Sequence, residues 1–152
     1  MRRFVSLGLV AFALAAAGCG DTTTNPTGSI VTSAVSPNPA IAQASTITPY
    51  QWTAAFTLTL TAPGAGVTVN TANAVVYQAA GGIITSTVDP ANVRIVANAS
   101  GNHIAANGSL PITYNVSYTL PDGSKGVLVR ITLSVTDDNG NTTSGIVDES
   151  VS

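Results

Sequence analysis

Three long segments of this chain carry an apolar side chain at every second position, and this period of two restricts the fold more than any other feature. The apolar positions are Ala54, Phe56, Leu58, Leu60 and Ala62 in the first segment, Ile112, Tyr114, Val116, Tyr118 and Leu120 in the second, and Val127, Val129, Ile131, Leu133 and Val135 in the third. Successive side chains of a β-strand point to opposite faces, so each segment predicts a strand with one buried face and one solvated face. Such alternation is typical of antiparallel sheets that are covered on one side only.

Stretches rich in glycine, proline and asparagine separate the strands. Pro121-Asp122-Gly123 and Asn139-Gly140 predict tight turns, because proline presets φ and glycine tolerates positive φ. Weaker strands are expected near residues 67–70, 74–79, 93–98 and 104–107, and edge strands near residues 30–35 and 145–151. A total of seven to nine short strands predicts an all-β, antiparallel sandwich of two sheets.

The C-terminal part of the chain resembles a bacterial immunoglobulin-like domain. The resemblance rests on residues 114–120, on the Pro121-Asp122-Gly123 turn, and on residues 131–141, which end in Thr-Asp-Asp-Asn-Gly-Asn. It implies an immunoglobulin-like β-sandwich over residues 29–152. The cysteine pair of antibody domains is missing, because Cys19 is the only cysteine. Since such sandwiches host many unrelated functions, the fold assigns none by itself.

The N-terminal segment indicates export. Arg2 and Arg3 precede a mostly apolar stretch that ends in Ala16-Ala17-Gly18-Cys19. A basic head, an apolar middle and small residues before a cut site are typical of a secretory signal peptide. The apolar stretch is shorter than the ~20 residues that span a bilayer. With a cysteine directly after the small residues, the segment resembles a bacterial lipoprotein signal.

That resemblance implies that residues 1–18, a helical signal peptide, are removed and that Cys19 receives fatty acyl chains such as palmitate. Residues 19–28 contain two glycines and a proline and predict a flexible tether. The protein is then expected in the cell envelope, anchored to a membrane by lipid, with its domain outside the cytoplasm. In this family an aspartate after the cysteine favours the inner membrane, so Gly20 implies the outer membrane in a host with two membranes. The alternative is an ordinary secretory signal that leaves Cys19 as a free thiol.

Charge excludes one class of partner, and the motifs give no support for catalysis. Beyond the signal segment the cations are Arg94, Lys125 and Arg130, too few for the basic stripe that nucleic acids require. His103 is the only histidine, with no nucleophile motif to accompany it. Asp148 and Glu149 are adjacent, so on a strand they face opposite ways. The expectation is a protein that is not an enzyme and that needs no cofactor.

Two groups of residues are candidates for binding. Tyr50 and Trp52 precede the first strong strand, where they either stack on a sugar or seat a partner, or else close the rim of the core. A second group falls at positions 1, 3, 5 and 12 of a calcium-loop pattern: Asp137, Asn139, Asn141 and Asp148. Thr142 occupies the sixth position, where that pattern needs glycine, and a hairpin turn explains the same residues.

The sequence therefore predicts a membrane-anchored envelope protein that serves as a binding, adhesion or spacer module for a protein or a polysaccharide. One alternative is a structural envelope component with no separate ligand. The other is a hydrolase of an unfamiliar kind, for which no nucleophile and base are apparent.

Overall fold

The computed structural model describes residues 30–152, which form ten β-strands and one short 3₁₀ helix, with no α-helix among them. In chain order these are β1 (Thr32–Ser36), β2 (Gln43–Ala44), β3 (Trp52–Thr61), β4 (Val67–Ala80), β5 (Ile83–Thr87), η1 (Pro90–Asn92), β6 (Val93–Ala99), β7 (His103–Ile104), β8 (Ser109–Tyr118), β9 (Val127–Asp137) and β10 (Thr142–Val151). Eight strands have five residues or more, within the predicted seven to nine, and the two-residue strands β2 and β7 extend the sheets.

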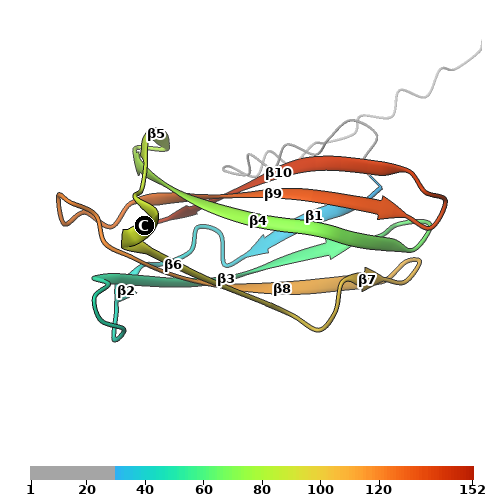
Figure 1. The fold of residues 1–152 in the computed structure, drawn as a ribbon, viewed down its shortest axis with the longest axis horizontal. Helices are drawn as coiled ribbons and strands as arrows, with labels where there is room; N and C mark the ends of the chain where they lie inside the picture. Colours follow the sequence, from blue (N-terminus) through green and yellow to red (C-terminus); the bar gives the residue numbers. More distant parts are fainter. Residues whose placement is uncertain (1–29) are drawn as a thin grey trace, which may run out of the picture.

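The strands form two antiparallel sheets that pack face to face (Figure 1). Sheet A has the order β1-β3-β8-β6, with β2 beside β3, and sheet B has the order β10-β9-β4-β5, with β7 beside β4. Sheet A thus follows the A-B-E-D order of an immunoglobulin domain, and sheet B follows its G-F-C-C′ order. The immunoglobulin-like sandwich predicted from the sequence is confirmed.

The predicted alternation is also confirmed in the three long segments. Every apolar position expected to face inward is buried, and Ile131 at the centre of β9 is wholly so. The residues between them are exposed or half-buried, apart from Ser117 and Leu128. Because β3, β8 and β9 lie inside their sheets, their inner faces supply most of the core.

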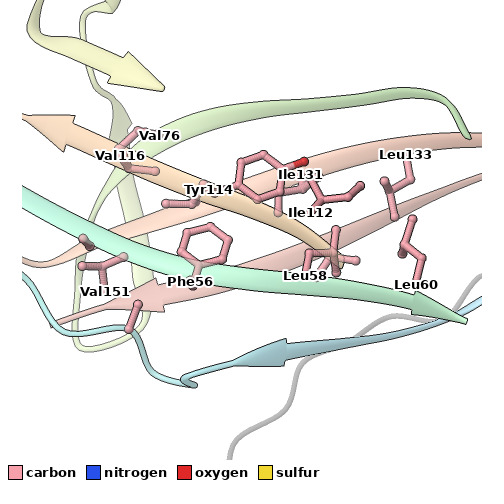
Figure 2. Close-up of a cluster of buried hydrophobic side chains, with 14 of the residues drawn as sticks. Phe56, Leu58, Leu60, Val76, Ile112, Tyr114, Val116, Ile131, Leu133 and Val151 are labelled. Carbon is pink, nitrogen blue, oxygen red and sulfur yellow. The ribbon is translucent and has the colours of Figure 1, made fainter. Parts of the chain in front are cut away.

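The centre of the core is a pair of aromatic rings from neighbouring strands of sheet A. Phe56 of β3 and Tyr114 of β8 stack with their ring centroids 5.3 Å apart. Figure 2 shows them between the sheets together with Ile131 and Leu133 of β9. The Tyr114 hydroxyl donates a hydrogen bond to the Ala72 carbonyl of sheet B at 3.1 Å. Burial raises the pKa of Tyr114 to about 12, so the hydroxyl stays protonated and able to donate.

The middle of the chain departs from the prediction in three places. Segments 67–70 and 74–79 are one strand, β4, because a bulge at Asn70 shifts the register with β9 without ending the pairing. Strand β5 was not expected, and a turn of two glycines with positive φ folds it back on β4. The strand expected at 104–107 stops early, since Asn107 adopts a positive φ in the following turn.

Candidate functional site

The two ends of the sandwich expose different residues (Figure 1). Ile30, the first described residue, lies beside residues 63–65 and Asp137, at the end where β3 leads to β4 and β9 leads to β10. We call the opposite end the far end; it holds the β2–β3 connection, the β4–β5 turn and the β8–β9 loop. Exposed isoleucines at the far end include Ile83, Ile47 and Ile84, with 71%, 40% and 36% of their surface exposed.

Cys19, the tether and the signal peptide lie outside the described residues. From residue 30 onward, no helix has the length and the apolar character needed to cross a membrane.

Tyr50 and Trp52, the candidate aromatic residues, lie at the far end where the chain enters β3. Both are half-buried, and Trp52 packs against the hydrophobic core. The indole Nε1 of Trp52 is buried, and no acceptor among the described residues bonds to it. The Tyr50 N–H donates to the Ile47 carbonyl at 2.9 Å, which closes a tight turn. Trp52 therefore closes the rim of the core, and Tyr50 shares a turn with the exposed Ile47.

The four candidate calcium ligands are not brought together. Asp137 is buried, and its carboxylate accepts hydrogen bonds from the Asn141 side chain at 2.8 Å and from the backbone N–H groups of Asn141 and Asn139 at 2.8 and 3.0 Å. These bonds, those from Asn141 first, hold the pKa of Asp137 below its ordinary value. Asp148 lies further along β10, where its carboxylate accepts two bonds from Arg130 at 2.8 and 2.7 Å. The hairpin-turn alternative accounts for the first three residues, and Asp148 is bonded elsewhere.

Metal ligands are scarce in the rest of the domain as well. Across residues 30–152, no group of three or more His, Cys, Asp or Glu side chains is placed to hold a metal ion.

The Arg130–Asp148 pair belongs to an outward-facing patch of sheet B that the sequence did not reveal. The Arg130 guanidinium lies over the Tyr77 ring, 5.6 Å from its centroid. The hydrogen bonds to Asp148 raise the pKa of Arg130, which keeps it charged. Val75 is paired with Arg130 across the sheet, and Val75 and Ile146 are 41% and 40% exposed. Only the register of β9 with β10 and β4 joins these residues, and no local motif signals it.

His103 is the first residue of β7, and its Nε2 lies 3.3 Å from Oδ1 of Asp138. The pairing of β7 with β4 fixes His103 beside Thr68, and Asp138 follows the end of β9. Both side chains are about half exposed, at 52% and 57%. Among the described residues, no hydroxyl group is hydrogen-bonded to His103. The His103–Asp138 pair therefore lacks the adjacent nucleophile that a catalytic triad requires.

An apolar hollow of about 220 Å³ lies between the two sheets on the side where β4 faces β6. Its lining consists of Ala74, Val75, Val76, Thr87, Val88, Pro90, Val93 and Ile95. Ala74, Val93 and Ile95 pack against the core but are only partly buried. The core is thus incompletely covered here. This gap in the cover exists because β5 pairs only with the end of β4, and no sequence pattern indicates where that pairing stops.

Comparison with known proteins supports the fold. No family model and no curated protein matches this chain. A solved structure, the X-ray structure of Northeast Structural Genomics Consortium target SoR45, is similar with a TM-score of 0.52 over 81% of this chain and 86% of that chain. Since the two sequences are 14% identical, the likeness establishes the fold alone.

Proposed function

We propose that the protein is a membrane-anchored, non-enzymatic binding module of a bacterial cell envelope. The lipoprotein-like signal ending at Cys19 supports the anchor. The position of Ile30 carries the rest of the proposal, because the chain enters the domain at the end opposite the far end. A domain tethered at that end, from Cys19 through residues 20–29, leaves its far end free to contact other molecules.

The far end has the chemistry of a contact surface. Ile47 and Ile83 are exposed there, and Tyr50 shares a turn with Ile47. Exposed apolar side chains with a tyrosine beside them are typical of surfaces that contact another molecule. The partner class is therefore an envelope protein or polysaccharide, and the rival function is a structural component that contacts only its own assembly.

The anchor is tested by metabolic labelling with a palmitate analogue, followed by fractionation. Wild-type protein is expected to carry the label and to remain with membranes. Cys19→Ala is expected to lose the label and to appear as a soluble or uncleaved form, because each buried acyl CH₂ contributes ~0.8 kcal/mol of membrane affinity. Thr22→Ala, in the tether, is the matched control and should behave as wild type. Wild-type protein without label overturns the anchor.

The outer-membrane location, which Gly20 favours, is tested by density fractionation in a host with two membranes. We expect the protein with outer-membrane markers. A Gly20→Asp variant should move toward inner-membrane fractions, and wild-type protein found with inner-membrane markers contradicts the assignment.

The contact surface is tested by co-sedimentation of the purified protein with insoluble envelope polysaccharide. We expect Ile47→Ser to reduce the bound fraction several-fold. Ile146→Ser removes an isoleucine of the same 40% exposure from the outer face of sheet B, so it is the matched control. Equal losses in the two variants contradict a far-end surface, and wild-type protein that binds neither polysaccharide nor envelope protein favours the structural role.

A further inference from the structure

Strand β4 has one continuously paired edge and one interrupted edge. Along the first edge it pairs with β9 over nearly its whole length. Along the second, β7 pairs with its first two residues and β5 pairs with residues 77–80. Two further backbone hydrogen bonds on this edge, from Val69 N–H to Asn102 and from Val88 N–H to the Val76 carbonyl, extend the bonded part of the edge only to Val69 and Val76. Residues 70–75 therefore have no neighbouring strand on this side, a gap of about 20 Å at 3.3 Å per residue.

At alternate residues of this gap, the backbone N–H and C=O groups point away from β9, toward the missing neighbour. Alternate residues of an antiparallel strand direct their N–H and C=O to the same side. The Val76 carbonyl accepts a bond from the Val88 N–H at 3.0 Å on the side away from β9, so Ala74 and Ala72 direct their groups the same way. The Tyr114 hydroxyl bonds to the Ala72 carbonyl, in the place where a strand would donate. The N–H and C=O of Ala74 face the gap with no strand beside them.

The apolar hollow lies at one end of this gap, against Ala74 and Val75. Ala74 lines it from β4, and Val93 and Ile95 line it from β6. These three side chains do not complete the core, since each remains partly buried. A strand placed against residues 70–75 would direct alternate side chains toward the core, and those beside Ala74 would enter the hollow. Aliphatic side chains arriving in that way would finish the core on this side.

The edge is also unprotected. Exposed strand edges are commonly blocked by proline or by charged side chains, and residues 70–75 include neither. Strand β5 pairs with β4 at one end of the gap, and β7 pairs with β4 at the other end (Figure 1). The rigid edge of a second folded copy would meet these strands before it reached β4, whereas a flexible segment passes between them.

We infer that residues 70–75 of β4, together with the hollow, bind an extended, uncharged peptide segment by strand addition. The lining of the hollow contains no ionisable side chain, so a charged side chain inserted there would be buried without a partner. The site therefore selects aliphatic side chains at alternate positions of the peptide. The inference rests on the described residues of β4, β5 and β6 and does not depend on a lipid anchor or on the far end.

The test is fluorescence anisotropy of a labelled Thr-Val-Thr-Val-Thr-Val peptide titrated with the full chain in detergent. We expect saturable binding. A Thr-Asp-Thr-Asp-Thr-Asp peptide, and the first peptide with alternate backbone amides methylated, should each bind at least about tenfold more weakly, because one places charge in the hollow and the other loses ladder hydrogen bonds. Equal affinity for the first and the methylated peptide overturns strand addition, and the comparison needs no protein variant.

A pair of variants locates the site. Ala74→Leu fills the hollow and should weaken peptide binding at least about tenfold. Asn73→Leu introduces the same side chain one residue away on the exposed outer face, so it should leave binding unchanged. Undiminished binding by a folded Ala74→Leu protein overturns the assignment. Sedimentation that shows wild-type dimers, lost in Ala74→Leu, would identify a second copy as the occupant and would also overturn the peptide inference.

Discussion

The two long sides of the sandwich are finished in different ways. On one side the segment between β1 and β2 runs along the end of β10, and Ala40 N–H donates to the Ser150 carbonyl at 2.9 Å and to Oε1 of Glu149 at 2.7 Å. The Ser152 N–H donates back to the Ala40 carbonyl at 3.1 Å. We call this the closed side. On the other, the open side, no strand among the described residues lies against residues 70–75 of β4.

Two alanines show the consequence. Ala40 on the closed side has none of its surface exposed, whereas Ala74 on the open side is partly buried above the hollow. The chain itself supplies the segment that completes the core on one side and supplies none on the other. A sandwich can therefore leave part of a strand edge open without losing its core, because the central strands β3, β8 and β9 supply most of the buried apolar side chains.

The largest expected effect concerns the core that both sides share. Ile131→Asp places an unpaired carboxylate where no solvent reaches, which together with lost packing should cost several kcal/mol of unfolding free energy, about half of the total for a typical domain. Thr132→Asp, exposed on the outer face, should change it by less than ~0.5 kcal/mol. Urea unfolding of protein lacking residues 1–19, followed by circular dichroism, measures both. Equal losses would contradict the inward and outward faces of β9.

On the closed side, enlargement of a buried residue should destabilise. Ala40→Leu forces three extra carbons into a wholly buried site, at an expected cost of about 1–3 kcal/mol. Ala44→Leu on the exposed strand β2 is the control and should change the unfolding free energy by less than ~0.5 kcal/mol. An Ala40→Leu protein as stable as wild type would mean that this side is not closed.

On the open side, the same substitution should have the opposite sign. Ala74→Leu fills the hollow and should raise the unfolding free energy by about 0.5–1 kcal/mol, as cavity-filling changes commonly do. Ala55→Leu, exposed on the outer face of β3, serves as the control, with a change near zero expected. If Ala74→Leu and Ala40→Leu destabilise equally in urea, the contrast between the two sides fails.

A smaller effect is expected at the β9–β10 hairpin, which belongs to neither the closed side nor the open side. The bonds from Asn141 and Asn139 lower the pKa of Asp137 from its ordinary 3.8. The stability that this provides is complete above pH 3.8 and is lost as pH falls through the lower, folded-state value. Asp137→Asn should therefore be less stable at pH 7 and should lose less stability on acidification, measured by urea unfolding between pH 7 and pH 2.5. Parallel pH profiles of the two proteins would contradict this role.

The sequence predicts well what a single strand determines by itself. The buried positions of β3, β8 and β9 follow from the period of two, and so does the separation of Glu149, which faces the core, from Asp148, which faces outward. The turn at Asn139-Gly140 follows from local conformational preferences. These features need no knowledge of which strand lies beside which.

Features that depend on neighbours could not be predicted. The Arg130–Asp148 pair requires the register of β9 with β10, and the contact of Ala40 with Glu149 joins residues 109 positions apart. The position of Asp148 depends on the same register, which pairs it with Arg130 and not with Asp137. The gap at residues 70–75 arises from the lengths of β5 and β7, which no pattern within β4 records.

The most direct test of the contrast between the sides is amide hydrogen exchange, resolved by residue with NMR in the free protein. Ala40 N–H is bonded on the closed side, and Val75 N–H points toward β9, whereas Ala74 N–H faces the gap. We predict that the Ala74 amide exchanges at least about a hundredfold faster than those of Ala40 and Val75, and that the Thr-Val-Thr-Val-Thr-Val peptide slows it. An Ala74 amide as slow as that of Ala40 in the free protein would contradict an open edge.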